Sequence, residues 1–160
     1  MTEHEPFDRH REKVQPAWID YNGHMNVAYY VLAFDHATDT FFEHIGFGDS
    51  YRQAENCSIF VSETHVNYFR EVHEGDPLRI TSQVLDLDEK RVHLYHRMYH
   101  ESDGYLAAST ELVVVHVDLG LRRSSPWRGE LADGLENFLA MHAGLDWPER
   151  AGKKMGIRRG

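Results

Sequence analysis

Four β-rich segments follow one another in the middle of the chain, joined by turns too short to hold a helix. Alternating or β-branched residues predict strands at 57–69, 78–84, 92–98 and 105–118. The connection from 84 to 92 contains the turn residues Asp88 to Lys90, which predicts a hairpin. Parallel strands need a crossover of a dozen or more residues. The segments therefore predict an antiparallel sheet and disfavour a parallel α/β fold.

One long helix is predicted ahead of these strands. Apolar residues recur at three- and four-residue steps from Val27 to Ile45, which places them on one helical face. Asn26 is a suitable N-cap and Gly46 a suitable C-cap. With a single long helix and consecutive strands, the expected class is α+β, with an antiparallel sheet wrapped around a central helix.

The chain of 160 residues is long enough for one well-buried domain. We expect a polar N-terminal segment at 1–13, the domain at 14–142, and a basic tail at 143–160. Inside the domain, a short strand or extended segment at 14–19 should lead to the long helix, and a weaker helix should cover 130–141.

Charge and composition narrow the classes of partner. The net charge of -9 argues against nucleic acid as the main partner, because phosphate binding needs a basic surface. No apolar run could cross a membrane, and the first ten residues lack a secretion signal, so we expect a cytoplasmic location. The single Cys57 is expected to be a small buried hydrophobe. No histidine pair suggests a metal, and we expect neither a metal nor a cofactor.

A polar turn, WIDYNGHMN, directly precedes the long helix and carries Asp20 and His24. Unpaired backbone N–H groups and the positive end of the helix dipole could polarise a carbonyl oxygen there, and Gly23 would let a substrate approach the backbone. The turn alone has two interpretations. Either Asp20 or Asn22 only caps the helix, or Asp20 takes part in chemistry.

This Asp-x-x-Gly-His-x-Asn turn, followed by a helix and four strands, resembles the hotdog-fold acyl-CoA thioesterases of the 4-hydroxybenzoyl-CoA thioesterase type. Element order agrees over residues 14–118. The stretches QPAWIDYNGHMN, VSETHVNYF, LDLDEKRVHLYHRMYH and PERAGKKMGI are similar to thioesterases of carnitine and betaine breakdown, some of them fused to carnitine dehydrogenase. The resemblance implies hydrolysis of a small acyl-CoA, possibly betainyl-CoA, by a homodimer or a dimer of dimers with its sites at the subunit interface.

The resemblance also implies roles for residues of the turn. Asp20 would be the nucleophile or the general base for water, and the sequence does not choose between these roles. The backbone at Gly23, His24 and Met25 would stabilise the oxyanion. The His24 side chain could bind the thioester oxygen, orient Asp20, or hold the turn together.

Polar residues interrupt the apolar face expected for the strand at 57–69. Glu63, His65 and Asn67 fall between Val61 and Phe69. In one interpretation Glu63, Thr64 and Asn67 complete the site across a subunit interface, with Glu63 catalytic. In the other, a β-bulge turns these side chains to solvent.

Binding residues are predicted on chemical grounds. A quaternary ammonium group is held by aromatic faces or a carboxylate, since it has no N–H to donate. The candidate substrate-binding residues are Trp18, Tyr21, Asn26, Tyr29, Phe60, Thr64, Asn67 and Tyr68, and the alternative for each aromatic residue is core packing. Lys153, Lys154 and Arg158 of the basic tail could meet the phosphates of coenzyme A, or the tail is only solvated.

Two further functions remain open at this point. A hotdog dehydratase or hydratase would need an acid–base pair at the α and β carbons of the acyl group, which the turn fits less well than it fits hydrolysis. A non-catalytic acyl-CoA binding domain would bind a thioester without releasing its thiol.

Overall fold

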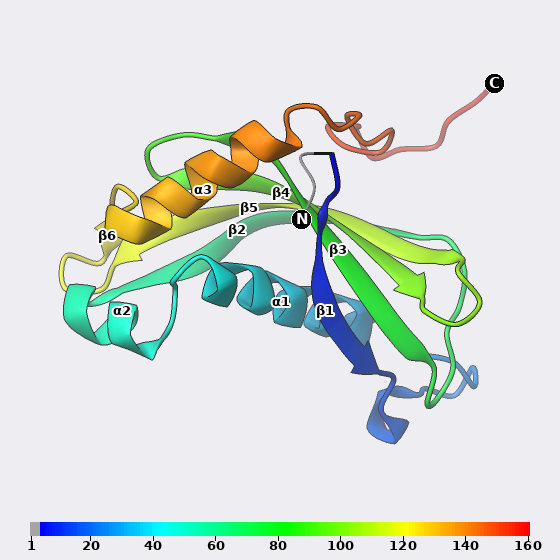
Figure 1. Ribbon diagram of the computed structural model, residues 1–160. Coiled ribbons are helices and arrows are strands. Elements are labelled where there is room, and N and C mark those ends of the chain that lie inside the picture. The colour runs from blue at the N-terminus through cyan, green and yellow to red at the C-terminus, as the bar shows by residue number, and fades with distance from the viewer. Residues whose placement is uncertain (1–3) are drawn as a thin grey trace.

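The computed structural model describes residues 4–160, and it contains one antiparallel sheet with a long helix packed against it (Figure 1). The strands are β1 (Phe7–Lys13), β2 (Cys57–Tyr68), β3 (Pro77–Leu87), β4 (Arg91–His100), β5 (Leu106–Asp118) and β6 (Arg123–Ser124). The helices are α1 (Val27–His44), α2 (Asp49–Glu55) and α3 (Gly129–His142), with a 3-10 turn at Pro16–Trp18. The strand order is β1-β3-β4-β5-β2, with β6 paired to β5. The predicted α+β class and hotdog architecture are confirmed.

Helix α1 begins and ends close to the predicted residues. The Asn26 side chain accepts a hydrogen bond from the Ala28 N–H at 3.0 Å, which confirms the N-cap. The helix ends at His44, is capped by Ile45, and is followed by Gly46 at a φ of +101°, a conformation that favours glycine. One face of α1 is buried against the sheet, as its apolar periodicity requires.

The C-terminal half of α1 packs on both β1 and α3. The Phe41 ring lies 5.4 Å from that of Phe7 and 5.2 Å from that of Phe138, centroid to centroid. Helix α3 runs along β3 beyond the end of β1, where the Val84 N–H donates to His142 Nδ1 at 2.9 Å. The predicted helix at 130–141 is therefore confirmed, and it covers backbone that β1 leaves unpaired.

Of the two alternatives for residues 14–19, the strand is wrong, whereas Gln15 and Ile19 are extended on either side of a 3-10 turn. The strand lies earlier, at Phe7–Lys13, and pairs with β3, whereas Pro16–Trp18 forms a 3-10 turn. Proline has a fixed φ and no N–H, so it suits the start of a helical turn better than a paired strand. Phe7 is buried in the core, and the charged residues of β1 are typical of an edge strand. Helix α2 was not predicted.

The fold places strand β2 beside the start of helix α1, where the candidate site residues lie. The end of β2 lies beside the first turn of α1, where the Tyr68 hydroxyl donates to the Val27 carbonyl oxygen at 3.1 Å. Within residues 4–160, no helix is both long enough and apolar enough to span a membrane.

Candidate active site

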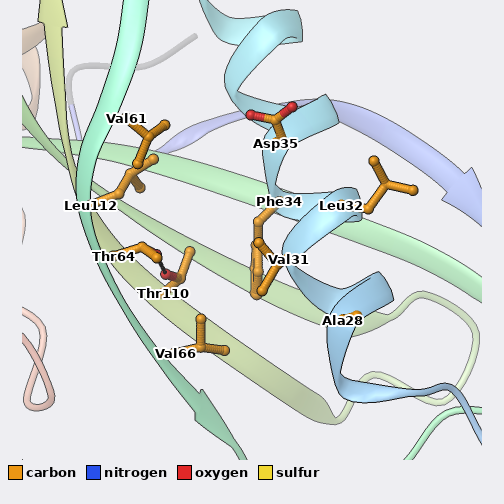
Figure 2. Close-up of a pocket in the computed structure, with 10 residues that line it drawn as sticks. All are labelled: Ala28, Val31, Leu32, Phe34, Asp35, Val61, Thr64, Val66, Thr110 and Leu112. Carbon is orange, nitrogen blue, oxygen red and sulfur yellow. Dashed lines mark hydrogen bonds between the residues drawn. The ribbon is translucent and has the colours of Figure 1, made fainter.

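A pocket of about 360 Å³ lies between α1 and the strands β2 and β5 (Figure 2). Its lining residues are Ala28, Val31, Leu32, Phe34 and Asp35 of α1, Val61, Thr64 and Val66 of β2, and Thr110 and Leu112 of β5. The two threonine hydroxyls are 2.9 Å apart, within hydrogen-bond distance. Asp35 is the one ionisable side chain of this lining. The pocket is thus mainly apolar, with a single carboxylate, and it begins at the first turn of α1.

The Asp20 carboxylate lies in the turn that precedes this end of the helix. Its Oδ1 accepts the backbone N–H of Asn22 at 2.8 Å, and its Oδ2 accepts the Asn26 side-chain amide at 3.1 Å. Asn26 in turn caps α1 through its other side-chain atom. Asp20 is half-buried, and each of its oxygens keeps a lone pair for a substrate or a water. The carboxylate is therefore oriented by the helix cap and still accessible.

Asn26 links the helix cap to Asp20, so its replacement should affect both. In Asn26→Ala we expect about 1 kcal/mol less stability from the lost cap. The variant also loses the hydrogen bond from the Asn26 amide to the charged Asp20, which should lower kcat on the order of tenfold. Thermal unfolding and steady-state kinetics measure the two effects. Asn22→Ala is the matched control, because only the backbone N–H of Asn22 holds Asp20. Equal losses in both variants would contradict the role of the Asn26 amide.

Two of the three backbone N–H groups predicted to stabilise an oxyanion are already used. Gly23 N–H donates to the Asp20 carbonyl at 3.0 Å, and Met25 N–H donates to the Val72 carbonyl at 2.9 Å. The N–H groups of His24 and Val27 have no backbone acceptor among residues 4–160. Val27 is the first residue of α1, where the helix dipole is positive. Sequence reasoning missed Val27, although the residue after an N-cap carries an unpaired N–H in any helix.

The His24 side chain holds the turn in place. Its Nε2 lies 3.5 Å from a carboxylate oxygen of Glu71, and its Nδ1 lies 3.4 Å from the Met25 carbonyl oxygen. In the described part of the chain, the hydrogen bonds to the Asp20 side chain are donated by Asn22 and Asn26, and none is donated by His24. Of the three predicted roles for His24, these contacts favour the structural one.

The aromatic candidates do not form one surface. Trp18 is only 8% exposed and stacks on Tyr29 at 5.7 Å, so it belongs to the core. Tyr21 is 96% exposed and lies outside the pocket lining. Phe60 and Tyr68 are exposed on β2, and Tyr68 meets Tyr30 edge-on at 5.1 Å. Among residues 4–160 of one chain, the candidates do not assemble an aromatic cage, and their roles in binding stay predictions.

A β-bulge in β2 separates the polar candidates. The pairing register with β5 shifts between Val61 and Glu63, which leaves Ser62 as the extra residue. After the bulge, Thr64 faces α1 and lines the pocket. Glu63 lies in a different pocket, and by alternation Asn67 shares its side of the sheet. The strand therefore contains a bulge, and within one chain only Thr64 of the three lines the pocket beside α1. The catalytic role of Glu63 across a subunit interface stays a prediction.

The basic tail also lies away from the turn that precedes α1 (Figure 1). Lys153 and Lys154 line the second pocket, of about 320 Å³, together with Glu63, His65, His93 and Glu111. The segment is anchored by the Gly152 N–H, which donates to the Glu111 carboxylate at 2.9 Å. Arg158 is exposed beyond it.

Comparison with known proteins agrees with this geometry. The family model of the thioesterase-like superfamily matches residues 14–151. The chain is 38% identical to a betainyl-CoA thioesterase of Pseudomonas aeruginosa, over 90% of this chain and 91% of that protein. It is 35% identical over 92% of its length to an L-carnitine dehydrogenase/betainyl-CoA thioesterase of Rhizobium meliloti, of which it spans only 29%.

A solved structure with a similar fold is a Staphylococcus aureus protein in complex with CoA. The TM-score is 0.89 at 27% identity, with 99% of this chain and 98% of the other covered. The fold, the turn before α1 and these matches lead to one assignment. The chain belongs to the thioesterase-like superfamily and is an acyl-CoA thioesterase of the hotdog fold.

Proposed function

We propose that this acyl-CoA thioesterase hydrolyses betainyl-CoA to betaine and coenzyme A. Two observations carry the proposal: an oriented, accessible carboxylate, Asp20, in the turn that precedes α1, and an apolar pocket that begins at Ala28 of α1 and holds one further carboxylate, Asp35. Such a pocket suits an acyl group that is both bulky and positively charged. The similarity to betainyl-CoA thioesterases over most of the chain supports the same substrate.

In the proposed reaction, the thioester carbonyl oxygen accepts hydrogen bonds from the N–H groups of Val27 and His24. Asp20 either attacks the carbonyl carbon itself or removes a proton from an attacking water. The carbon–sulfur bond then breaks, and the CoA thiolate leaves and is protonated. Where Asp20 is the nucleophile, water next hydrolyses the mixed anhydride between Asp20 and the acyl group, which releases the acid and restores the carboxylate. Water supplies the new oxygen of the acid, so neither a metal nor a cofactor is needed.

Free-thiol detection with a panel of CoA thioesters tests the substrate assignment. We expect the highest kcat/KM with betainyl-CoA, compared with acetyl-CoA, short neutral acyl-CoAs and benzoyl-CoA. A wide margin in favour of a neutral or aryl thioester would contradict the proposal. Hydration of an enoyl-CoA, or tight binding without thiol release, would instead indicate one of the other two functions, which no finding supports.

We further propose that two chains pair, as a homodimer or a dimer of dimers, with sites at the subunit interface. Strand β2 is at the end of the strand order, so one of its edges is free for pairing. Large apolar side chains are exposed on α1 and β2, namely Val27, Val31, Leu32, Phe60, Val61 and Tyr68. Light scattering coupled to gel filtration tests the assembly, and a monomer at micromolar concentration would contradict it.

The basic tail is proposed to meet the phosphates of coenzyme A through Lys153, Lys154 and Arg158. The exposed positive charges of these residues support this role. In Lys153→Ala/Lys154→Ala we expect KM for the CoA thioester to rise about 3- to 10-fold while kcat is unchanged, because uniform binding is lost. An unchanged KM would contradict the assignment. We also propose a cytoplasmic location, in which the free, buried Cys57 stays reduced.

A further inference from the structure

Asp35 occupies an unusual position for a carboxylate. It lies in the third turn of α1 and faces the apolar pocket from the end opposite Ala28, close to Val61 (Figure 2). The neighbouring His36 pairs with Glu12 of β1 and not with Asp35. Among residues 4–160, Asp35 has no ion-pair partner within 4.0 Å. The pocket therefore contains one negative charge that this chain itself leaves uncompensated.

Two further carboxylates follow Asp35 along α1. Asp39 lies one turn further along α1 and Glu43 one turn beyond that. Burial raises the pKa of Asp39, and the charges of Asp35 and Glu43 raise it further. Like charges four residues apart destabilise a helix. A positively charged group bound in the pocket would relieve this repulsion.

We propose that Asp35 selects acyl groups that carry a positive charge, while the apolar lining holds the methyl groups around that charge. The inference rests on the proposed function, since it explains how the same pocket would distinguish a cationic acyl group from a neutral one of the same shape. Val31, Val61 and Val66 supply the apolar contacts, and Asp35 supplies the opposite charge.

The distance along α1 between Asp35 and the first turn determines how strongly Asp35 attracts a cationic acyl group. Asp35 is seven residues beyond Ala28, which is about 10 Å along the axis. An ammonium group next to a carbonyl held at the first turn would lie roughly 9 Å from the carboxylate. With an effective dielectric constant of about 20, this attraction corresponds to a preference of roughly 20-fold. Because Asp35 is exposed and partly screened, we expect about tenfold.

A pair of substrates with one shape isolates the charge. In 3,3-dimethylbutanoyl-CoA a carbon atom replaces the nitrogen of betainyl-CoA, so that only the positive charge is lost. We expect the wild-type protein to favour betainyl-CoA, and Asp35→Asn to lower kcat/KM about tenfold for betainyl-CoA alone. Asp35→Glu, which keeps the charge, should keep most of the preference. Glu43→Gln is the matched control, because Glu43 lies about 12 Å from Asp35 along the helix.

The outcomes separate this inference from the proposed function. If Asp35→Asn lowers the turnover of both substrates equally, Asp35 is catalytic or structural and the inference is wrong. An unchanged ratio between the substrates in Asp35→Asn also overturns it, while betainyl-CoA hydrolysis by the wild type would stand. If the wild type shows no preference for betainyl-CoA, the proposed function fails and the role of Asp35 fails with it.

Discussion

Asp20→Asn should lower kcat for betainyl-CoA by about 10²- to 10⁴-fold, the usual contribution of a positioned general base. The amide has nearly the shape of the carboxylate and can still accept the Asn22 N–H, so the turn should keep its conformation. It can neither remove a proton from water at neutral pH nor form an acyl intermediate. Steady-state kinetics with free-thiol detection give kcat, and thermal unfolding verifies that the variant is folded.

A matched control for this loss is Asp133→Asn, which removes an exposed carboxylate on α3. Its kcat should equal that of the wild type. A folded Asp20→Asn protein that kept more than a tenth of the wild-type kcat would rule out Asp20 as the essential carboxylate. Rapid quenching followed by mass spectrometry then separates the two roles, because only a nucleophilic Asp20 carries the acyl group during turnover.

Phe41→Ala should lower the free energy of unfolding by about 3–5 kcal/mol, as expected for a fully buried phenylalanine. The Phe41 side chain has no exposed surface, and its ring lies between those of Phe7, Phe42 and Phe138. The variant would leave a cavity where β1, α1 and α3 meet. Urea unfolding followed by circular dichroism measures the change.

The comparison for this loss is Leu121→Ala, since Leu121 is exposed beyond the end of β5. Its free energy of unfolding should change by less than about 0.5 kcal/mol. If Phe41→Ala cost no more than Leu121→Ala, the contact among the three elements would not stabilise the fold as the structure indicates.

Helices and strands whose apolar residues recur at a regular spacing were predictable from sequence. Elements without such a pattern were not. The apolar face of α1 repeats over eighteen residues, and the strands β3 and β4 alternate regularly, so their type and order were evident. Strand β1 has one apolar residue, Phe7, among six polar ones, so its sequence shows no apolar face. Helix α2 has seven residues and none of them is buried, so it has no apolar periodicity to detect.

The candidate site was predictable where it depends on neighbours in sequence. Asp20, Asn22 and Asn26 are close along the chain, and the turn that joins them could be recognised. Asp35 could not be assigned to a pocket from sequence. It lines a pocket only because β2 lies opposite α1 in the folded chain. The positions of Glu63 and Thr64 depend on pairing with β5, which a single strand's sequence does not determine.

The bulge at Ser62 has a consequence for how such pockets change over evolution. The twelve residues of β2 can present two different sets of side chains to α1, depending on whether one residue is left unpaired. With the bulge, Thr64 and Val66 line the pocket beside α1. In a regular strand of the same sequence, Glu63, His65 and Asn67 would take their place. A one-residue insertion in β5 opposite Ser62 could therefore convert an apolar binding pocket into one lined by acid–base groups, without any substitution in β2.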